Sequence, residues 1–248
     1  MLELNKIYNY DVLEGLKELD DNSIDLIITS PPYNLSGFRG YKPKTEKKAR
    51  WHRQIIYGGN EDIDFIDEEE YQQQQIEILN ECYRVLKPTG SMFYNHKNRI
   101  KNFEISNPYS WIVQSDFIVR QEIIWDRGST VNLSPTRYLP MTEKIYWLTK
   151  GRNEVRFNRK FSNIGKEVWS IPKEKNNKHP APFPIDIPNN IIPTIAQGNR
   201  ITILDPFMGS GTVAVSAKLN NCDYIGFELF QEYIEMANER LKTCDLEI

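Results

Sequence analysis

The sequence predicts an α/β fold built on a doubly wound, mostly parallel sheet of seven strands. Short β-branched and apolar runs alternate with amphipathic helical segments along the chain. The run Ser23–Ser30 is almost continuously apolar, as in a strand that helices cover on both faces. With 248 residues, 40% hydrophobic and 26% charged, the chain is long enough to bury such a core in one domain, residues 1–248.

The expected elements follow in order. Leu13, Leu16 and Leu19 share one face of the first helix, and Pro88-Thr89-Gly90 should end the second. The strands are expected at Ile7–Tyr10, Ser23–Ser30, Ser91–Tyr94, Phe117–Trp125, Glu143–Leu148, Ile201–Leu204 and Tyr224–Glu228. The helices are expected at Val12–Leu19, Glu68–Leu86, Pro184–Ala196, Thr212–Leu219 and Gln231–Leu241. The fourth and fifth strands are candidates for an antiparallel pair.

The charge is unevenly distributed. The net charge is −3, yet residues 35–60 carry +6 and residues 151–178 carry +5. Two basic segments on an acidic body are typical of a local positive face, although such runs are also found as solvated loops. Residues 35–60 lack an apolar period, which predicts a long loop.

Other features of the sequence limit the class of protein to which the chain can belong. The three cysteines and three histidines are scattered without metal-type spacing, so we expect no metal site. The cysteines are interpreted as reduced thiols of a cytoplasmic protein. No apolar run is long enough to span a membrane, and Met1–Lys6 lacks a secretion signal.

A glycine-rich turn follows the strand Ile201–Leu204. Asp205 is followed by Gly209 and Gly211 and then by a helix, a pattern that lets a ligand lie against backbone. No lysine follows Gly211, which excludes the Walker phosphate loop. Glu228 ends the next strand, where such folds hold ribose hydroxyls. A simple helix-packing turn is the structural alternative.

A double proline follows the strand Ser23–Ser30. Pro31 and Pro32 remove two backbone donors, so nearby carbonyls and the Ser30 hydroxyl remain as acceptors. Two acceptors can bind the hydrogens of an exocyclic amine and turn its lone pair toward an incoming methyl group. Tyr33 is then placed to stack on a base held outside a duplex. A proline-stiffened turn with a core aromatic residue is the alternative.

Together the double-proline motif and the glycine-rich motif resemble those of the β-group of S-adenosylmethionine-dependent DNA amino-methyltransferases. Ile28–Tyr33 is similar to that family's catalytic motif, and Ile203–Thr212 to its cofactor motif. The catalytic motif comes first, as in the circularly permuted members of this Rossmann-like fold. Lys178–Pro184 is similar to the segment beside the methionine end of the cofactor, and Tyr224–Glu228 to the ribose-binding strand.

The resemblance implies a set of site residues. The catalytic residues would be Ser30, Pro31, Pro32 and Tyr33. The residues binding S-adenosylmethionine would be Asp11, His179, Pro182, Phe183, Asp205, Phe207, Gly209, Gly211, Thr212 and Glu228. The DNA-binding residues would be Arg39, Lys42, Lys44, Lys47, Lys48, Arg50, Trp51 and Arg53. Residues 151–178 would form a small target-recognition insertion; Trp51 would stack on a base or pack against the protein.

The resemblance also implies the substrate. Members with serine before the double proline mostly methylate cytosine N4, so a site-specific cytosine-N4 enzyme acting on double-stranded DNA is expected, with adenine N6 as the alternative. RNA or protein methylation, or a non-catalytic DNA-binding subunit, fits less well. We also expect the chain to belong to a restriction-modification system with a cognate endonuclease. It should have no membrane partner and act as a monomer or homodimer.

Overall fold

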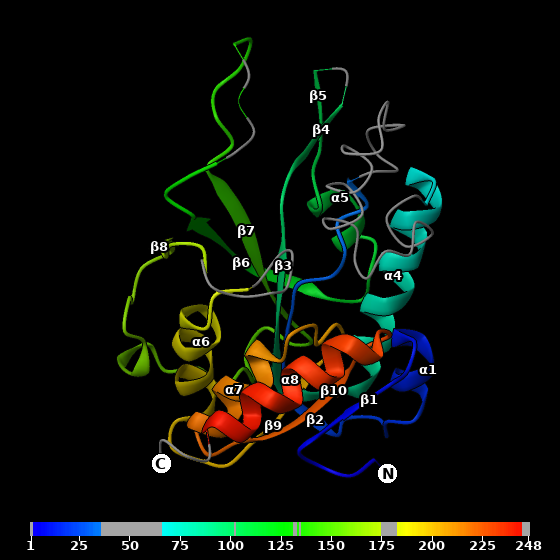
Figure 1. The fold of residues 1–248 in the computed structure, drawn as a ribbon, viewed down its shortest axis with the longest axis vertical. Helices are drawn as coiled ribbons and strands as arrows, with labels where there is room; N and C mark the ends of the chain where they lie inside the picture. The colour runs from blue at the N-terminus through cyan, green and yellow to red at the C-terminus, as the bar shows by residue number, and fades with distance from the viewer. Residues whose placement is uncertain are drawn as a thin grey trace.

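A computed structural model describes residues 2–35, 66–101, 103–130, 133, 135–174 and 183–244. One sheet has the strand order β1-β10-β9-β2-β3-β7-β6-β8 (Figure 1). Its strands are β1 Lys6–Tyr8, β2 Ile24–Thr29, β3 Leu86–His96, β6 Ile118–Asp126, β7 Thr142–Thr149, β8 Val168–Ser170, β9 Thr202–Asp205 and β10 Asp223–Phe227. A separate hairpin joins β4 Arg99–Lys101 to β5 Glu104–Ser106.

The sheet is mostly parallel, as predicted. Among the described strands of the sheet, only β7 runs antiparallel to its two neighbours, β3 and β6, and the β6–β7 pair is the antiparallel one expected from the sequence. The sheet has eight strands where seven were predicted. The eighth, β8, has three residues, lies in the polar segment 151–178 and pairs with β6. So short a strand has too little alternation to be recognised in the sequence.

Helices cover both faces of the sheet. Helices α1 Val12–Lys17, α4 Glu68–Val85 and α5 Tyr109–Ile112 pack on one face. Helices α6 Asp186–Ala196, α7 Thr212–Leu219 and α8 Gln231–Cys244 pack on the other, and a 3-10 turn, η2 Arg159–Phe161, lies beside α6. Strand β2 alternates between them: Ile27 packs with the first group, and Leu26 and Ile28 with the second. The doubly wound arrangement is therefore confirmed.

Strand β3 begins five residues earlier than predicted. Leu86 leaves α4 with extended backbone and pairs with Ile24, and the next pair joins Ser91 to Leu26. The Pro88-Thr89-Gly90 segment therefore bulges from the strand instead of forming a separate turn. A side chain on Gly90 would come within 2.8 Å of the Asp25 carbonyl oxygen, so only glycine fits there.

The strand order reverses between β2 and β9. Strands β9, β10 and β1 extend the sheet to one side, and β2 and β3 extend it to the other. In open α/β sheets ligands bind at the carboxyl ends of the strands beside such a point. Among the described residues no helix is long and apolar enough to cross a membrane.

Candidate active site

The two motifs meet at the point where the strand order reverses. Strands β2 and β9 are paired neighbours, and the Thr29 hydroxyl donates a 2.8 Å hydrogen bond to Asp205. A cavity of about 300 Å³ opens beside this bond. Ser30 and Pro32 line it from one side, and residues 205–210 from the other. Segments some 175 positions apart in the sequence therefore share one cavity.

The glycine turn has left-handed backbone at Gly209 and Gly211, with φ of 51° and 80°. Gly209 lines the cavity, and its N–H donates to Glu228 at 2.8 Å. Gly211 instead faces α8: a Cβ there would lie 2.6 Å from the Ala237 Cβ. Gly211 thus serves helix packing, which was the structural alternative for this turn, whereas Gly209 lines the space where a ligand fits.

Buried carboxylates lie on the cavity wall. Burial raises the pKa of Asp205 to about 7, against the opposing effect of hydrogen bonds from Thr29 and the Phe207 N–H. Burial also raises the pKa of Glu228, which accepts hydrogen bonds from Gly209 and Phe230. Buried acids of this kind favour hydroxyl or cationic groups as ligands.

The cavity also has an apolar wall. Tyr10, Phe207, Phe227 and Phe230 line it, together with Ile78 of α4. An apolar wall with a few convergent polar groups is typical of sites for nucleoside-sized ligands. The α4 residues were not among the predicted site residues, because their spacing is that of any helix that packs on a core.

Three more predicted cofactor residues lie on this cavity. Asp11 lines it while its carboxylate caps α1 by accepting from the Leu13 N–H at 2.9 Å. Phe183 and Thr212 also line it, and the Phe183 ring packs edge-on against Trp125. His179 and Pro182 lie outside the described residues.

The serine of the double-proline turn belongs to a polar network. Ser30 Oγ lies 2.8 Å from the Tyr33 hydroxyl, which donates to Glu143 Oε2 at 2.9 Å. Asn95 Nδ2 donates to Tyr33 at 2.6 Å and to Glu143 at 3.0 Å. Arg127 forms an ion pair of 2.8 Å with the other oxygen of Glu143. Asn95 and Glu143 lie within β3 and β7, and Arg127 follows β6. None of the three was predicted, because these strands carry no motif.

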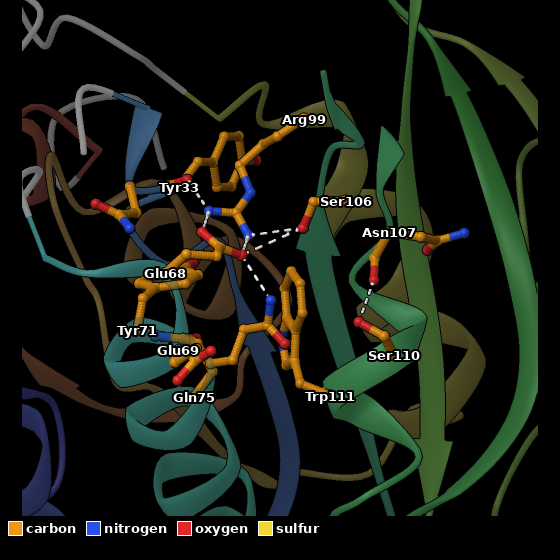
Figure 2. A network of polar contacts seen from close by, with 12 residues as sticks. Tyr33, Glu68, Glu69, Tyr71, Gln75, Arg99, Ser106, Asn107, Ser110 and Trp111 are labelled. Atoms are coloured by element: carbon orange, nitrogen blue, oxygen red, sulfur yellow. Dashed lines mark hydrogen bonds and ion pairs between the residues drawn. The ribbon is translucent and has the colours of Figure 1, made fainter. Parts of the chain in front are cut away.

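A second network supports the turn from behind (Figure 2). The buried Arg99 guanidinium forms an ion pair with Glu68 at 2.6 Å and donates to the Tyr33 carbonyl at 3.3 Å. The Tyr71 hydroxyl donates to the Pro32 carbonyl at 2.7 Å and contacts His96 Nε2 at 2.9 Å. Burial and the charge of Arg99 hold the pKa of His96 well below its usual range. The turn is therefore held rigidly by neutral and paired groups.

The Tyr33 ring packs against His96, with centroids 4.4 Å apart, and Lys97 Nζ lies 5.4 Å from its centroid. Tyr33 is not among the residues lining the cavity, and neither is Pro31. The structure therefore places the tyrosine hydroxyl in the network beneath Ser30. Stacking of Tyr33 on a base stays a prediction.

The basic segment predicted to bind DNA, with Arg39, Lys42, Lys44, Lys47, Lys48, Arg50, Trp51 and Arg53, lies outside the described residues. Its flanking residues are held together at the cavity. Asn34, which is fully buried, donates to the Ile66 carbonyl at 2.8 Å and accepts from the Ile66 N–H at 3.2 Å. Ile66 itself lines the cavity.

Of the second basic segment, residues 151–174 are described, and they contain η2 and β8. Burial, together with the charge of Arg127, lowers the pKa of Lys173. In the described ranges, no group of three histidine, cysteine or acidic side chains is arranged to hold a metal.

Comparison with known proteins agrees with this geometry. The N6/N4 methyltransferase family, described as DNA methylase, matches residues 24–239. The Type II methyltransferase M.HinfI of Haemophilus influenzae is 31% identical over 96% of this chain and 68% of its own length. Among solved structures, the cytosine-N4-specific PvuII DNA methyltransferase shares the fold with a TM-score of 0.74 and 22% identity, covering 95% of this chain and 85% of its own.

A complex of M1.HpyAVI with S-adenosylmethionine, the cofactor expected from the sequence, also shares the fold. Its TM-score is 0.66 at 22% identity, with 95% of this chain and 98% of that chain covered. The circularly permuted order of the two motifs, the cavity that joins them and the family match across most of the chain agree. The chain belongs to the N6/N4 DNA methylase family.

Proposed function

We propose that this chain transfers a methyl group from S-adenosylmethionine to the exocyclic amine of a base turned out of double-stranded DNA, with cytosine N4 as the target. One observation carries the proposal. A single cavity joins the Ser30-Pro31-Pro32 turn, which offers acceptors for an amine, to the Asp205–Gly209 turn, which suits the cofactor. The Thr29–Asp205 hydrogen bond locks the two turns side by side.

The cofactor would lie along the glycine turn. Five residues that line the cavity would bind it: Glu228 the ribose hydroxyls, Asp205 and Gly209 the polar tail, and Phe207 with Ile78 the adenine. His179, Pro182 and Phe183 would approach its methionine end. Bound there, the sulfonium supplies an activated methyl group, so the protein contributes mainly proximity and orientation.

The double-proline turn would bind the amine. Ser30 lines the cavity, and its Oγ would accept one amine hydrogen. The carbonyl of Pro31, the next residue, does not line the cavity as described and would have to turn toward the base to accept the other. The Pro32 carbonyl is already engaged by Tyr71, so it is a support for the turn and not a ligand. Accepting both hydrogens makes the nitrogen more tetrahedral and directs its lone pair at the methyl group.

DNA would lie across the two basic segments. The described residues on either side of the first segment, Asn34 and Ile66, are hydrogen-bonded to each other, and Ile66 lines the cavity. We expect the cations of this segment to contact the DNA. Neutralisation of phosphates by these cations would make binding weaken steeply as salt rises. A cognate restriction endonuclease, and action as a monomer or homodimer, remain part of the proposal.

Transfer of a tritiated methyl group to DNA, RNA and peptide substrates tests the activity, and analysis of the product base tests the target. The proposal expects label in DNA as 4-methylcytosine within one short sequence. Label found only as 6-methyladenine would replace the target base and keep the reaction. No label in DNA, with label in RNA or peptide, would overturn the proposed function.

A further inference from the structure

The network beneath Ser30 has a single direction of hydrogen-bond donation. Glu143, paired with Arg127, accepts hydrogen bonds through Oε2 from both the Tyr33 hydroxyl and Asn95 Nδ2. A carboxylate only accepts, so the one hydroxyl proton of Tyr33 is directed to Glu143. The Tyr33 oxygen is then an acceptor toward its other neighbours, Asn95 and Ser30.

Ser30 must therefore be the donor in its 2.8 Å contact with Tyr33. Its hydroxyl proton points down into the network. Ser30 Oγ also accepts a 3.3 Å hydrogen bond from Asn95 Nδ2, which leaves one lone pair for the cavity that Ser30 lines. We infer that Glu143 is a positioning residue that, acting through Tyr33, fixes Ser30 Oγ as a hydrogen-bond acceptor for the target amine. This inference rests on the function proposed above.

The environment suits this role. The Glu143 and Arg127 side chains are 8% and 9% exposed, so their ion pair is shielded from solvent. Arg127 also donates to the Met141 and Pro140 carbonyls at 3.3 and 2.7 Å, which fixes the guanidinium. A buried, fully oriented charge polarises the hydrogen bonds attached to it more strongly than a solvated one.

Glu143→Gln tests the direction of hydrogen-bond donation without changing the shape of the side chain. Arg127 holds the amide oxygen, so the amide nitrogen faces Tyr33 and donates to it. The Tyr33 proton then turns toward Ser30, whose own proton is driven into the cavity, where it opposes an amine hydrogen. We expect kcat to fall roughly 10- to 100-fold, with the Kd and binding stoichiometry of S-adenosylmethionine and the KM for DNA changed less than about threefold.

Tyr33→Phe distinguishes a positioning role of Glu143, exerted through Tyr33, from a purely structural role of Glu143. With the hydroxyl removed, the direct path from Glu143 to Ser30 is lost, and only the longer 3.3 Å contact of Asn95 with Ser30 still links the two. Adding Glu143→Gln to Tyr33→Phe should therefore cost less than about twofold in kcat. Glu143→Asp keeps an acceptor-only group and should recover part of the lost activity. Glu122→Gln is the matched control, because Glu122 forms an ion pair of 2.9 Å with Lys144 on the same pair of strands, away from Ser30.

The outcomes separate the two claims. Wild-type kcat in Glu143→Gln, or an equal loss from Glu143→Gln with and without the Tyr33 hydroxyl, overturns the positioning role. If Ser30→Ala retains full methyl transfer, or the wild type labels no DNA, the proposed function fails instead. A cofactor stoichiometry well below one in Glu143→Gln would assign the loss to misfolding and would also overturn the inference.

Discussion

The two sides of the cavity are built by different means. On the cofactor side, β9, β10 and the turn between β9 and α7 present backbone groups and two buried acids, with glycine where space is needed. On the side of Ser30, residues from β2, β3, β7 and the end of β6 present side chains joined by hydrogen bonds and one ion pair. The first side comes largely from elements that follow one another in the chain, β9, α7 and β10; the second joins residues from strands far apart in the sequence.

Ser30→Ala should have the largest effect, because it removes the acceptor that the whole network orients. We expect kcat to fall roughly 100- to 1000-fold while the cofactor Kd stays within about twofold. Single-turnover methyl transfer with equilibrium cofactor binding measures both. A loss of cofactor affinity as large as the loss of kcat would show that the Ser30 side also binds the cofactor, which contradicts the division of the cavity into two sides.

Asp205 gives the cofactor side a pH dependence of stability. Its folded pKa of about 7 lies above the ordinary aspartate value of 3.8, so between these pH values the folded state holds a proton that the unfolded state releases. The free energy of unfolding should therefore fall as pH rises from about 4 through 7, by an amount on the order of a few kcal/mol. Urea unfolding at pH 5 and pH 8 measures this slope.

Asp205→Asn keeps the shape of the side chain and should remove that slope, because an amide does not titrate in this range. It should also weaken cofactor binding. An unchanged slope would show that another group carries it.

Gly211→Ala separates packing from ligand contact within the glycine turn. The new Cβ would lie 2.6 Å from Ala237 Cβ on a left-handed backbone, so we expect a loss of about 2–3 kcal/mol in the free energy of unfolding. Gly165→Ala is the control: its φ is also positive, at 62°, and nothing lies within 4 Å, so about 1 kcal/mol is expected. Comparable losses in urea titrations of the two variants would refute the packing role.

Glu122→Gln should have the smallest effect. Its partly exposed ion pair with Lys144 is outside the network, so a change below about 0.5 kcal/mol in stability and no change in kcat are expected. A loss of activity here would mean that any charge on these two strands, and not the network alone, affects the site.

The sequence predicted most of this fold and one side of the site. Helix Thr212–Leu219 has its predicted bounds. Asp205, Gly209 and Glu228 line the cavity, because the consecutive strands β9 and β10 are parallel neighbours that end on the same side of the sheet. Asn95 and Glu143 could not be found in this way. Their partnership depends on β7 pairing with β3, which no local pattern specifies.

Gly211 shows the complementary limit. Its motif was recognised, but whether it faces a ligand or Ala237 depends on where α8 packs. The three-residue strand β8 was missed for lack of any repeating pattern.

A crystal structure of the chain with S-adenosylmethionine is the most direct measurement of whether these two sides make one site. The account predicts the adenosyl group between Ile78 and Phe207, the ribose at Glu228, and the sulfonium methyl group facing Ser30 Oγ. Cofactor bound outside this cavity, or bound with its methyl group directed away from Ser30, would contradict it.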